Sequence, residues 1–136
     1  MAGKLCNEGE TSVGNVYLKG EAQPAFWLGL FKNVAEPAED DVMTDITEAD
    51  TPGQNGYARI ALGDADWTES PQGVFTNLQK TFTCATLAWG DCYGYFVTTA
   101  ETGTAGKLVS AELFSDGPYP MSVGFITKVT PAITVA

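Results

Sequence analysis

Turn-forming sequences divide this chain into short segments, and that division limits its fold more than any other feature. Such sequences stand at 52–56 (PGQNG), 69–73 (ESPQG), 101–106 (ETGTAG) and 115–120 (SDGPYP). Glycine, proline, asparagine and aspartate favour tight turns because they adopt or stabilise the backbone angles that reverse the chain. Between the turns, apolar residues recur with the period of two of a strand, and helical periodicity is almost absent. We therefore expect seven or eight short strands.

The apolar pattern places these strands. Residues 25–31 (AFWLGLF) form a continuous apolar run, as in a strand that is buried on both faces. Residues 121–129 show the clearest period-two alternation in the chain. Within 74–84, Lys80 is the exception to the alternation and indicates a bulge or a sheet edge. The other expected strands cover residues 57–62, 87–97, 107–114 and 133–135.

This pattern predicts an all-β fold, a single antiparallel β-sandwich that is jelly-roll-like or a small barrel. A length of 136 residues suits one domain, which we assign to residues 25–136. Residues 1–24 are expected to form an extended N-terminal arm or a first strand. Residues 36–50 hold seven acidic side chains and are expected to form a solvated loop, with a single helical turn near 40–44 as the alternative.

The charge balance argues against two classes of partner. The chain carries 17 acidic and 7 basic residues, for a net charge of −10, and its only arginine is Arg59. Nucleic acids and anionic membranes attract clusters of Lys and Arg, so we expect neither as a partner. The first residues lack the apolar run of a signal peptide, and three cysteines are an odd number, so we expect assembly in a reducing cytoplasm. The thiols are expected to be free, with a Cys84–Cys92 disulfide as the less favoured alternative.

The residue types present restrict the possible chemistry. Without histidine, the chain lacks Ser–His and Cys–His nucleophilic pairs and the usual zinc ligand sets. Glycoside hydrolysis by two carboxyl groups is the enzymatic route left open. The carboxyl groups that could serve it are those of Asp64, Asp66, Asp91 and Glu112. Their spacing does not distinguish them from solvated turn acids, so we assign no catalytic residue and no cofactor.

The sequence was also compared with the spacing of known metal-binding loops. The oxygen-rich sequence GDADW (63–67) and the acidic segment 36–50 both lack the spacing of an EF-hand loop. An irregular calcium site in these segments stays open. We assign no metal ligand.

The stretch WGDCYGYFVTT (89–99) has two interpretations, a reactive cysteine or an ordinary strand. Asp91 lies beside Cys92 and would raise the pKa of the thiol, and no basic residue adjoins it to lower that pKa. Trp89, Tyr93 and Tyr95 fall on one face of a strand and offer a large contact area. The strand interpretation is therefore preferred.

Fifteen aromatic residues are many for a domain of this size. Because Tyr and Trp are enriched in subunit contacts, some of these residues are candidates for an interface. The candidates are Trp27, Phe31, Trp67, Trp89, Tyr93, Tyr95 and Tyr119. The alternative is that all of them lie in one core.

Several short sequences follow one another in a characteristic order from about Ala25 to the end of the chain. They are AFWLGLFKN, TDITEAD, GQNGYARIAL, the isolated Trp67, CYGYFVTT, LVSAELFSDGPYPMSVG and VTPAITV. In this order they resemble a group of small virion proteins of tailed bacteriophages, similar to capsid decoration (cement) proteins or to small tail and fibre components. The group often has Gly-Asp before its last strands, where this chain has Val123-Gly124-Phe125.

The resemblance implies a non-enzymatic structural protein on the outer surface of the capsid. Such a protein would bridge neighbouring major capsid subunits, with itself as a further partner in a homotrimer, and the N-terminal arm would fasten neighbours. Two alternatives come from other classes. One is a tail fibre, tail adaptor or receptor-binding module, and the other is the carboxylate-dependent glycosidase considered above.

Overall fold

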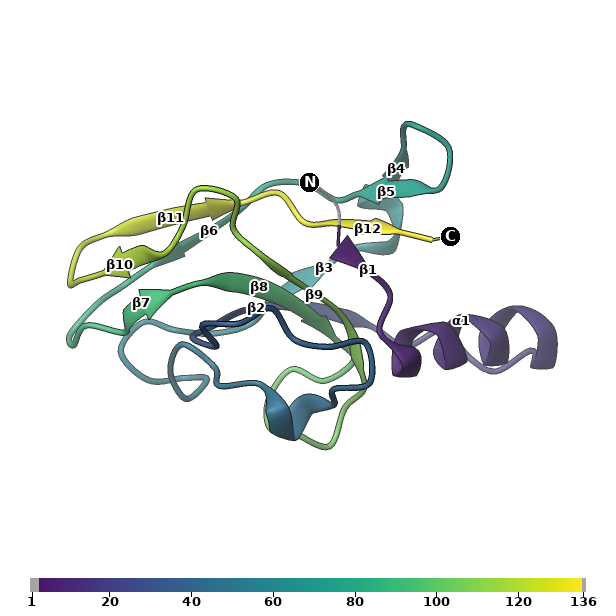
Figure 1. Ribbon diagram of the computed structural model, residues 1–136, viewed down its shortest axis with the longest axis horizontal. Helices are drawn as coiled ribbons and strands as arrows, with labels where there is room; N and C mark the ends of the chain where they lie inside the picture. The colour runs from purple at the N-terminus through teal and green to yellow at the C-terminus, as the bar shows by residue number, and fades with distance from the viewer. Residues whose placement is uncertain (1–2, 136) are drawn as a thin grey trace.

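The computed structural model describes residues 3–135, which form a mostly β structure with a helix near the amino terminus (Figure 1). Within this range there are twelve strands and one α-helix, α1 (Asn7–Lys19). Two short 3-10 turns cover Met43–Asp45 and Asp64–Asp66. The strands are β1 (Gly3–Lys4), β2 (Phe26–Phe31), β3 (Ile60–Leu62), β4 (Thr68–Glu69), β5 (Val74–Thr76), β6 (Lys80–Thr83), β7 (Gly90–Cys92), β8 (Gly94–Thr98), β9 (Leu108–Leu113), β10 (Tyr119–Met121), β11 (Ile126–Val129) and β12 (Ala132–Thr134).

One layer of the structure is an antiparallel sheet of order β3-β2-β8-β9. Two positions in its central strands leave no room for a side chain and are occupied by glycine. A Cβ atom on Gly94 would lie 2.1 Å from the Glu112 carbonyl oxygen, and one on Gly29 would lie 2.3 Å from the Phe96 ring. These small residues allow the large aromatic rings of this sheet to cover neighbouring backbone.

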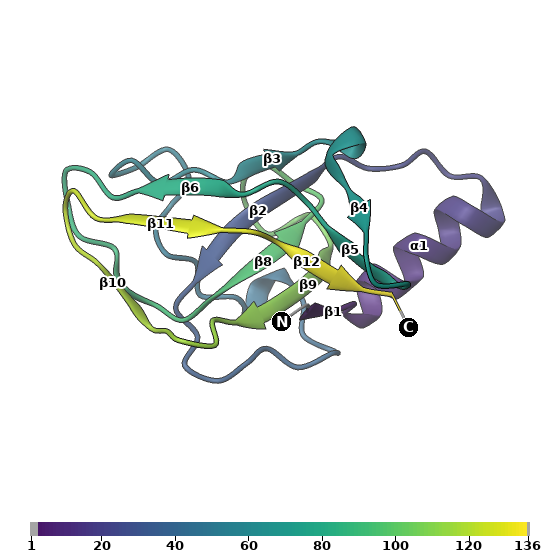
Figure 2. The ribbon, with the colours of Figure 1, turned by 90° about the horizontal axis from the view of Figure 1, so that it is seen from above.

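The opposite layer consists of two sets of paired strands, and the second set continues in line with the first. β6 pairs with β11, and β5 pairs with β12, with β4 and β1 at the two sides of this second set. Seen from above, β5, β6, β11 and β12 lie across β2, β8 and β9 (Figure 2). A large apolar core, including Leu28, Leu30, Phe82, Val97 and Met121, lies buried in the body.

The predicted strand 74–84 is interrupted, and a side chain causes the break. Asn77 donates its backbone N–H to the Pro131 carbonyl and its side-chain amide to the Gly63 carbonyl. Its side-chain oxygen accepts from the Leu78 N–H. The side-chain bonds interrupt the regular strand in the segment that joins β5 to β6, because an asparagine side chain competes for backbone groups.

The clearest predicted strand, 121–129, is also divided. Residues 122–125 form a turn between β10 and β11, in which Phe125 N–H donates to the Ser122 carbonyl. Gly124 has φ of +87°, a left-handed conformation that glycine adopts without cost. An alternating pattern cannot reveal such a reversal, so the prediction of one continuous strand was wrong here.

The N-terminal segment is helical rather than extended. α1 ends at Lys19, and the next residue, Gly20, caps it in the left-handed conformation with φ of +72°. Its first turn carries Glu8, which accepts from the Leu108 N–H and pairs with Lys107 at 3.2 Å. The expectation of an extended arm was wrong, and the strand at the start of the segment, β1, is only two residues long. Residues 1, 2 and 136 of the predicted ranges lie outside the described residues.

The acidic segment 36–50 is a loop with one 3-10 turn, as expected. It is not wholly solvated, because Met43 and Ala49 are buried. Asp41 and Asp45 accept bonds from backbone N–H groups within the segment. The acids thus stabilise local turns while two apolar side chains anchor the segment to the body.

Candidate interaction surfaces

Three of the predicted interface residues lie inside the chain. Phe31, Trp89 and Tyr95 are each at most 5% exposed. The Trp89 ring meets Tyr57 edge-on at 5.3 Å, and its indole N–H donates to the Asn55 carbonyl at 2.9 Å. These three side chains make their contacts inside the folded chain. The alternative that they belong to the core therefore holds for them.

The other four candidates are half-buried. Trp67 and Tyr119 pack against the main core, and Tyr93 packs against a smaller core around Phe31 and Phe96. Trp27 is partly exposed on β2. The structure does not gather these four side chains at one place, and their role in an interface stays a prediction.

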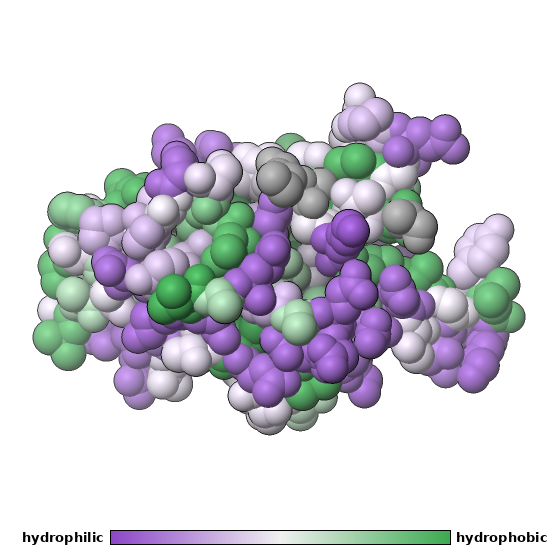
Figure 3. Space-filling model, in the orientation of Figure 1, coloured by the Kyte–Doolittle hydropathy of each residue, from purple (hydrophilic) through white to green (hydrophobic). Residues whose placement is uncertain are grey.

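Large apolar side chains are more exposed elsewhere, and two groups of them lie at the two ends of the long axis; Val34 (71% exposed, after β2) and Leu78 (57%, between β5 and β6) belong to neither group. The first group, which we name the tip, consists of Leu87, Val123, Phe125 and Ile126, with exposed fractions of 51–63%. It lies at the end formed by the β6–β7 and β10–β11 connections, where hydrophobic residues gather on the surface (Figure 3).

The second group lies on the far half of α1, which projects from the opposite end of the body (Figure 1). We name it the helix end; it comprises Val13, Tyr17 and Leu18. Tyr17 is 86% exposed and Leu18 is 80% exposed. The near half of α1 is held by Gly9, on which a Cβ atom would lie 2.4 Å from the Val109 carbonyl oxygen.

A charge pattern in the sequence could have found the tip. Residues 81–90 and 117–127 contain no Asp, Glu, Lys or Arg, although the chain carries 24 such residues. The helix end gave a weaker signal, because its apolar residues are few and share no clear period.

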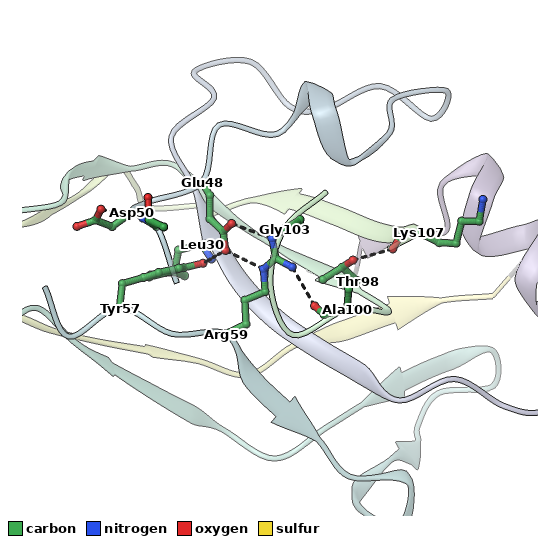
Figure 4. A network of polar contacts seen from close by, with 10 residues as sticks. Leu30, Glu48, Asp50, Tyr57, Arg59, Thr98, Ala100, Gly103 and Lys107 are labelled. Carbon is green, nitrogen blue, oxygen red and sulfur yellow. Dashed lines mark hydrogen bonds and ion pairs between the residues drawn. The ribbon is translucent and has the colours of Figure 1, made fainter. Parts of the chain in front are cut away.

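A buried polar cluster joins three distant parts of the chain (Figure 4). The Arg59 guanidinium donates to both carboxylate oxygens of Glu48 at 2.8 Å. It also donates to the carbonyl oxygens of Ala100 and Gly103, and lies 5.4 Å from the centre of the Phe96 ring. Arg59 therefore ties the acidic segment and the loop after β8 to the central sheet.

Tyr57 completes this cluster. Its hydroxyl donates to Glu48 at 2.6 Å and accepts from the Leu30 N–H at 3.1 Å. Burial, followed by the Glu48 carboxylate, raises the pKa of Tyr57 well above its usual range. All polar atoms named here are satisfied by one another, so the cluster has the character of a structural clamp. Sequence reasoning had considered Arg59 only as an isolated charge.

The three cysteines are buried and free, as expected. Burial raises the pKa of the Cys92 thiol to about 12 and that of the Cys6 thiol to about 11. A thiol with such a pKa is protonated near neutral pH and is a poor nucleophile. The strand interpretation of the sequence around Cys92 therefore fits the chemistry of that thiol.

The four carboxylates considered for hydrolysis are distributed over three elements. Asp64 and Asp66 share a 3-10 turn, Asp91 lies in β7 and Glu112 lies in β9. Glu112 is buried and accepts from the Tyr95 hydroxyl at 2.8 Å. Burial raises the pKa of Glu112, and the bond from Tyr95 opposes this rise. Glu112 is thus engaged by a core hydroxyl, with no hydrogen bond to any of the other three in the range 3–135.

Searches for other kinds of site give limited findings. Across residues 3–135, no group of three or more Cys, Asp or Glu side chains is placed to hold a metal ion. In the same range, no helix combines the length and apolarity needed to cross a bilayer. No protein-family model matches the sequence, and no curated protein matches it either.

Proposed function

We propose that this chain is a non-enzymatic structural protein of a tailed-phage virion that decorates the outer capsid surface. In this role it stabilises the shell by bridging neighbouring major capsid subunits. The order of short motifs from Ala25 onward supports the proposal, as does a mostly β body with two facing layers, which suits a single jelly-roll-like sandwich. The observation that carries it is the presence of exposed apolar side chains at both ends of the long axis. A bridging protein needs two separate contacts.

We assign the contact with the shell to the helix end. α1 projects from the body, so Tyr17 and Leu18 reach beyond the sheets without moving them. Tyrosine supplies a large contact area at low entropic cost and is enriched at the centres of interfaces. The N-terminal segment thus keeps the fastening role that was expected for it, although it forms a helix and not an extended arm.

Stabilisation of the shell would follow from mass action. A ligand that binds one state of a target and not another stabilises the bound state by RT ln(1 + [L]/Kd). Contacts made only with the expanded, mature shell would favour that state against contraction or rupture. Many weak contacts per capsid would then together give a large stabilisation of the mature shell.

The shell contact is tested by co-sedimentation of the purified chain with mature capsids that lack it. Wild-type protein is expected to pellet with the shells, and the double variant Tyr17→Ser, Leu18→Ser is expected to stay in the supernatant. Both side chains are largely exposed, so the fold should persist, and circular dichroism checks this.

The matched control is Leu78→Ser, which replaces an exposed apolar residue away from α1. It is expected to bind like wild type. Equal binding by wild type and the double variant would contradict the role of the helix end, and no binding by wild type would contradict capsid decoration.

A further inference from the structure

A small pocket lies beside the turn that connects β9 to β10. The buried residues Tyr95 and Glu112 line it, together with Asp116, Tyr119 and Lys128 nearer the solvent. Its volume is about 150 Å³. Pockets that hold drug-sized ligands measure about 300–1,000 Å³, so this one suits a single small ring.

Three neighbouring aromatic rings line this pocket. The Phe114 ring centre lies 6.2 Å from that of Tyr95 and 4.5 Å from that of Tyr119. Phe114 and Tyr119 are half-buried, so part of each ring stays open to a ligand. The face of an aromatic ring is apolar and carries partial negative charge, so it attracts C–H groups.

Two of these aromatic residues also orient carboxylates. The Tyr95 hydroxyl donates to Oε2 of Glu112 at 2.8 Å, and the Tyr119 hydroxyl donates to Oδ1 of Asp116. Burial raises the pKa of Tyr95, and the bond to Asp116 raises the pKa of Tyr119 to about 12. Both hydroxyls therefore stay protonated near neutral pH and keep donating. Titratable groups with shifted pKa values gather at functional sites more often than elsewhere.

Glu112 has bonding capacity left over. Its side chain belongs to a residue that is only 5% exposed, and Tyr95 occupies one of its two carboxylate oxygens. In the described part of the chain, no donor is bonded to the other oxygen, Oε1. A buried carboxylate oxygen at a pocket can accept a hydrogen bond from a ligand and gains strength from the low dielectric around it.

Lys128 adds a donor of the opposite charge. Its side chain is exposed, lines the same pocket and forms no ion pair within residues 3–135. The pocket thus presents carboxylate acceptors and an ammonium donor beside apolar rings. Ligand sites commonly combine aromatic walls with a few polar groups that fix the orientation of the ligand.

This combination selects the class of ligand. A sugar ring carries hydroxyl groups that both donate and accept, and it has a face of C–H groups that suits an aromatic ring. A phosphate or another anion would meet the charges of Glu112 and Asp116 on a chain with net charge −10. An alkyl ammonium ion would pair with Glu112 but would meet the like charge of Lys128.

We propose that this pocket binds one neutral sugar ring. The C–H face of the ring lies against Phe114 and Tyr119. Its hydroxyls donate to Glu112 and Asp116 and accept from Lys128. No residue of α1 lines the pocket, so sugar binding does not depend on capsid decoration and would continue while the helix end contacts a shell.

The experiment is a titration of the whole chain, without capsids, followed by two-dimensional amide NMR. The probes are the methyl glycosides of glucose, galactose, mannose and N-acetylglucosamine. At least one is expected to bind saturably with a Kd on the order of 1 mM, because a ligand of this size has few atoms to contribute. The shifted signals should come from residues 112–119 and 128–130, which surround the pocket.

Two variants test the carboxylates. Glu112→Gln should raise the Kd at least about tenfold, because hydrogen bonds to charged groups are the stronger ones. Asp116→Asn should also raise it, and its exposed position leaves the core intact. Glu101→Gln is the matched control, since it removes an exposed acid that does not line the pocket, and it should bind like wild type. Urea midpoints check that each variant folds.

The proposal is overturned if none of the four glycosides binds saturably, or if the shifted signals lie away from the pocket. Equal binding by wild type and the folded variants of Glu112 and Asp116 would also overturn it. Saturation of the same signals by n-butylammonium, with no response to any glycoside, would assign the pocket to a cation instead. Because capsids are absent, these outcomes are separate from those of the capsid-binding test.

Discussion

Arg59 and Glu48 form a bidentate ion pair, in which Nε donates to Oε2 and Nη2 donates to Oε1, both at 2.8 Å. The Arg59 side chain is almost completely buried, and the Glu48 side chain is 17% exposed. The pair fastens an acidic loop whose remaining charges face water. A buried guanidinium needs such a partner, because an unpaired buried charge is costly.

Replacing Glu48 by glutamine should strongly destabilise the protein. Glu48→Gln leaves the Arg59 charge without its partner, and breaking a buried pair on one side costs about 3–5 kcal/mol. Urea unfolding measures the change. The control Glu39→Gln, an exposed acid of the same loop, should stay within about 0.5 kcal/mol of wild type. Equal unfolding midpoints for the two variants would refute the structural role of the pair.

The thiols should be unreactive in the folded protein. Burial and raised pKa values at Cys6 and Cys92 predict that a thiol reagent labels the native chain very slowly at pH 8. All three cysteines should react quickly in urea. The control Leu87→Cys places a thiol at an exposed site and should give one fast reaction. Fast labelling of native wild type would contradict the burial.

Tyr57 should make stability depend on alkaline pH. Its folded pKa is raised, so its contribution is complete below the unfolded value of about 10 and is lost as pH rises above it. The stability advantage of wild type over Tyr57→Phe should therefore shrink by about 1 kcal/mol between about pH 10 and pH 11. Urea unfolding at several pH values tests this. A constant advantage would mean that Tyr57 is accessible and ionises in the folded state.

Two glycines should respond oppositely to alanine. Gly94→Ala places a Cβ atom 2.1 Å from the Glu112 carbonyl oxygen, where backbone must move. This crowding should cost at least about 1–3 kcal/mol. Gly14→Ala, in α1 with nothing within 4 Å, should gain about 0.5–1 kcal/mol. Thermal unfolding of both variants distinguishes crowded from open positions, and similar shifts would contradict the packing at Gly94.

Local pattern predicted most strands but not where they break or meet. The run 25–31 became β2 because a continuous apolar segment suits the middle of a sheet. Asn77 and Gly124 divide two predicted strands, and each acts through bonds to residues far away in sequence. The periodicity of apolar residues in the sequence does not reveal such long-range hydrogen bonds. The helix 7–19 was missed because its apolar residues are sparse and its start is held by contact with β9.

The interface residues show the same limit. Aromatic type alone could not separate Phe31 and Trp89, which fill the core, from an exposed surface. Exposure depends on how the turns pack against each other, and backbone bonds of Cys84 to Gly124 and Phe125 join the two connections that carry the tip residues. The absence of charge in 81–90 and 117–127 was the available signal.

The most direct test of capsid decoration is a cryo-EM reconstruction of virions whose genome encodes this chain, with gel densitometry for copy number. The account predicts hundreds of copies on the outside of the shell, with α1 against capsid subunits. A few copies confined to the tail would contradict it and favour a fibre, adaptor or receptor-binding role.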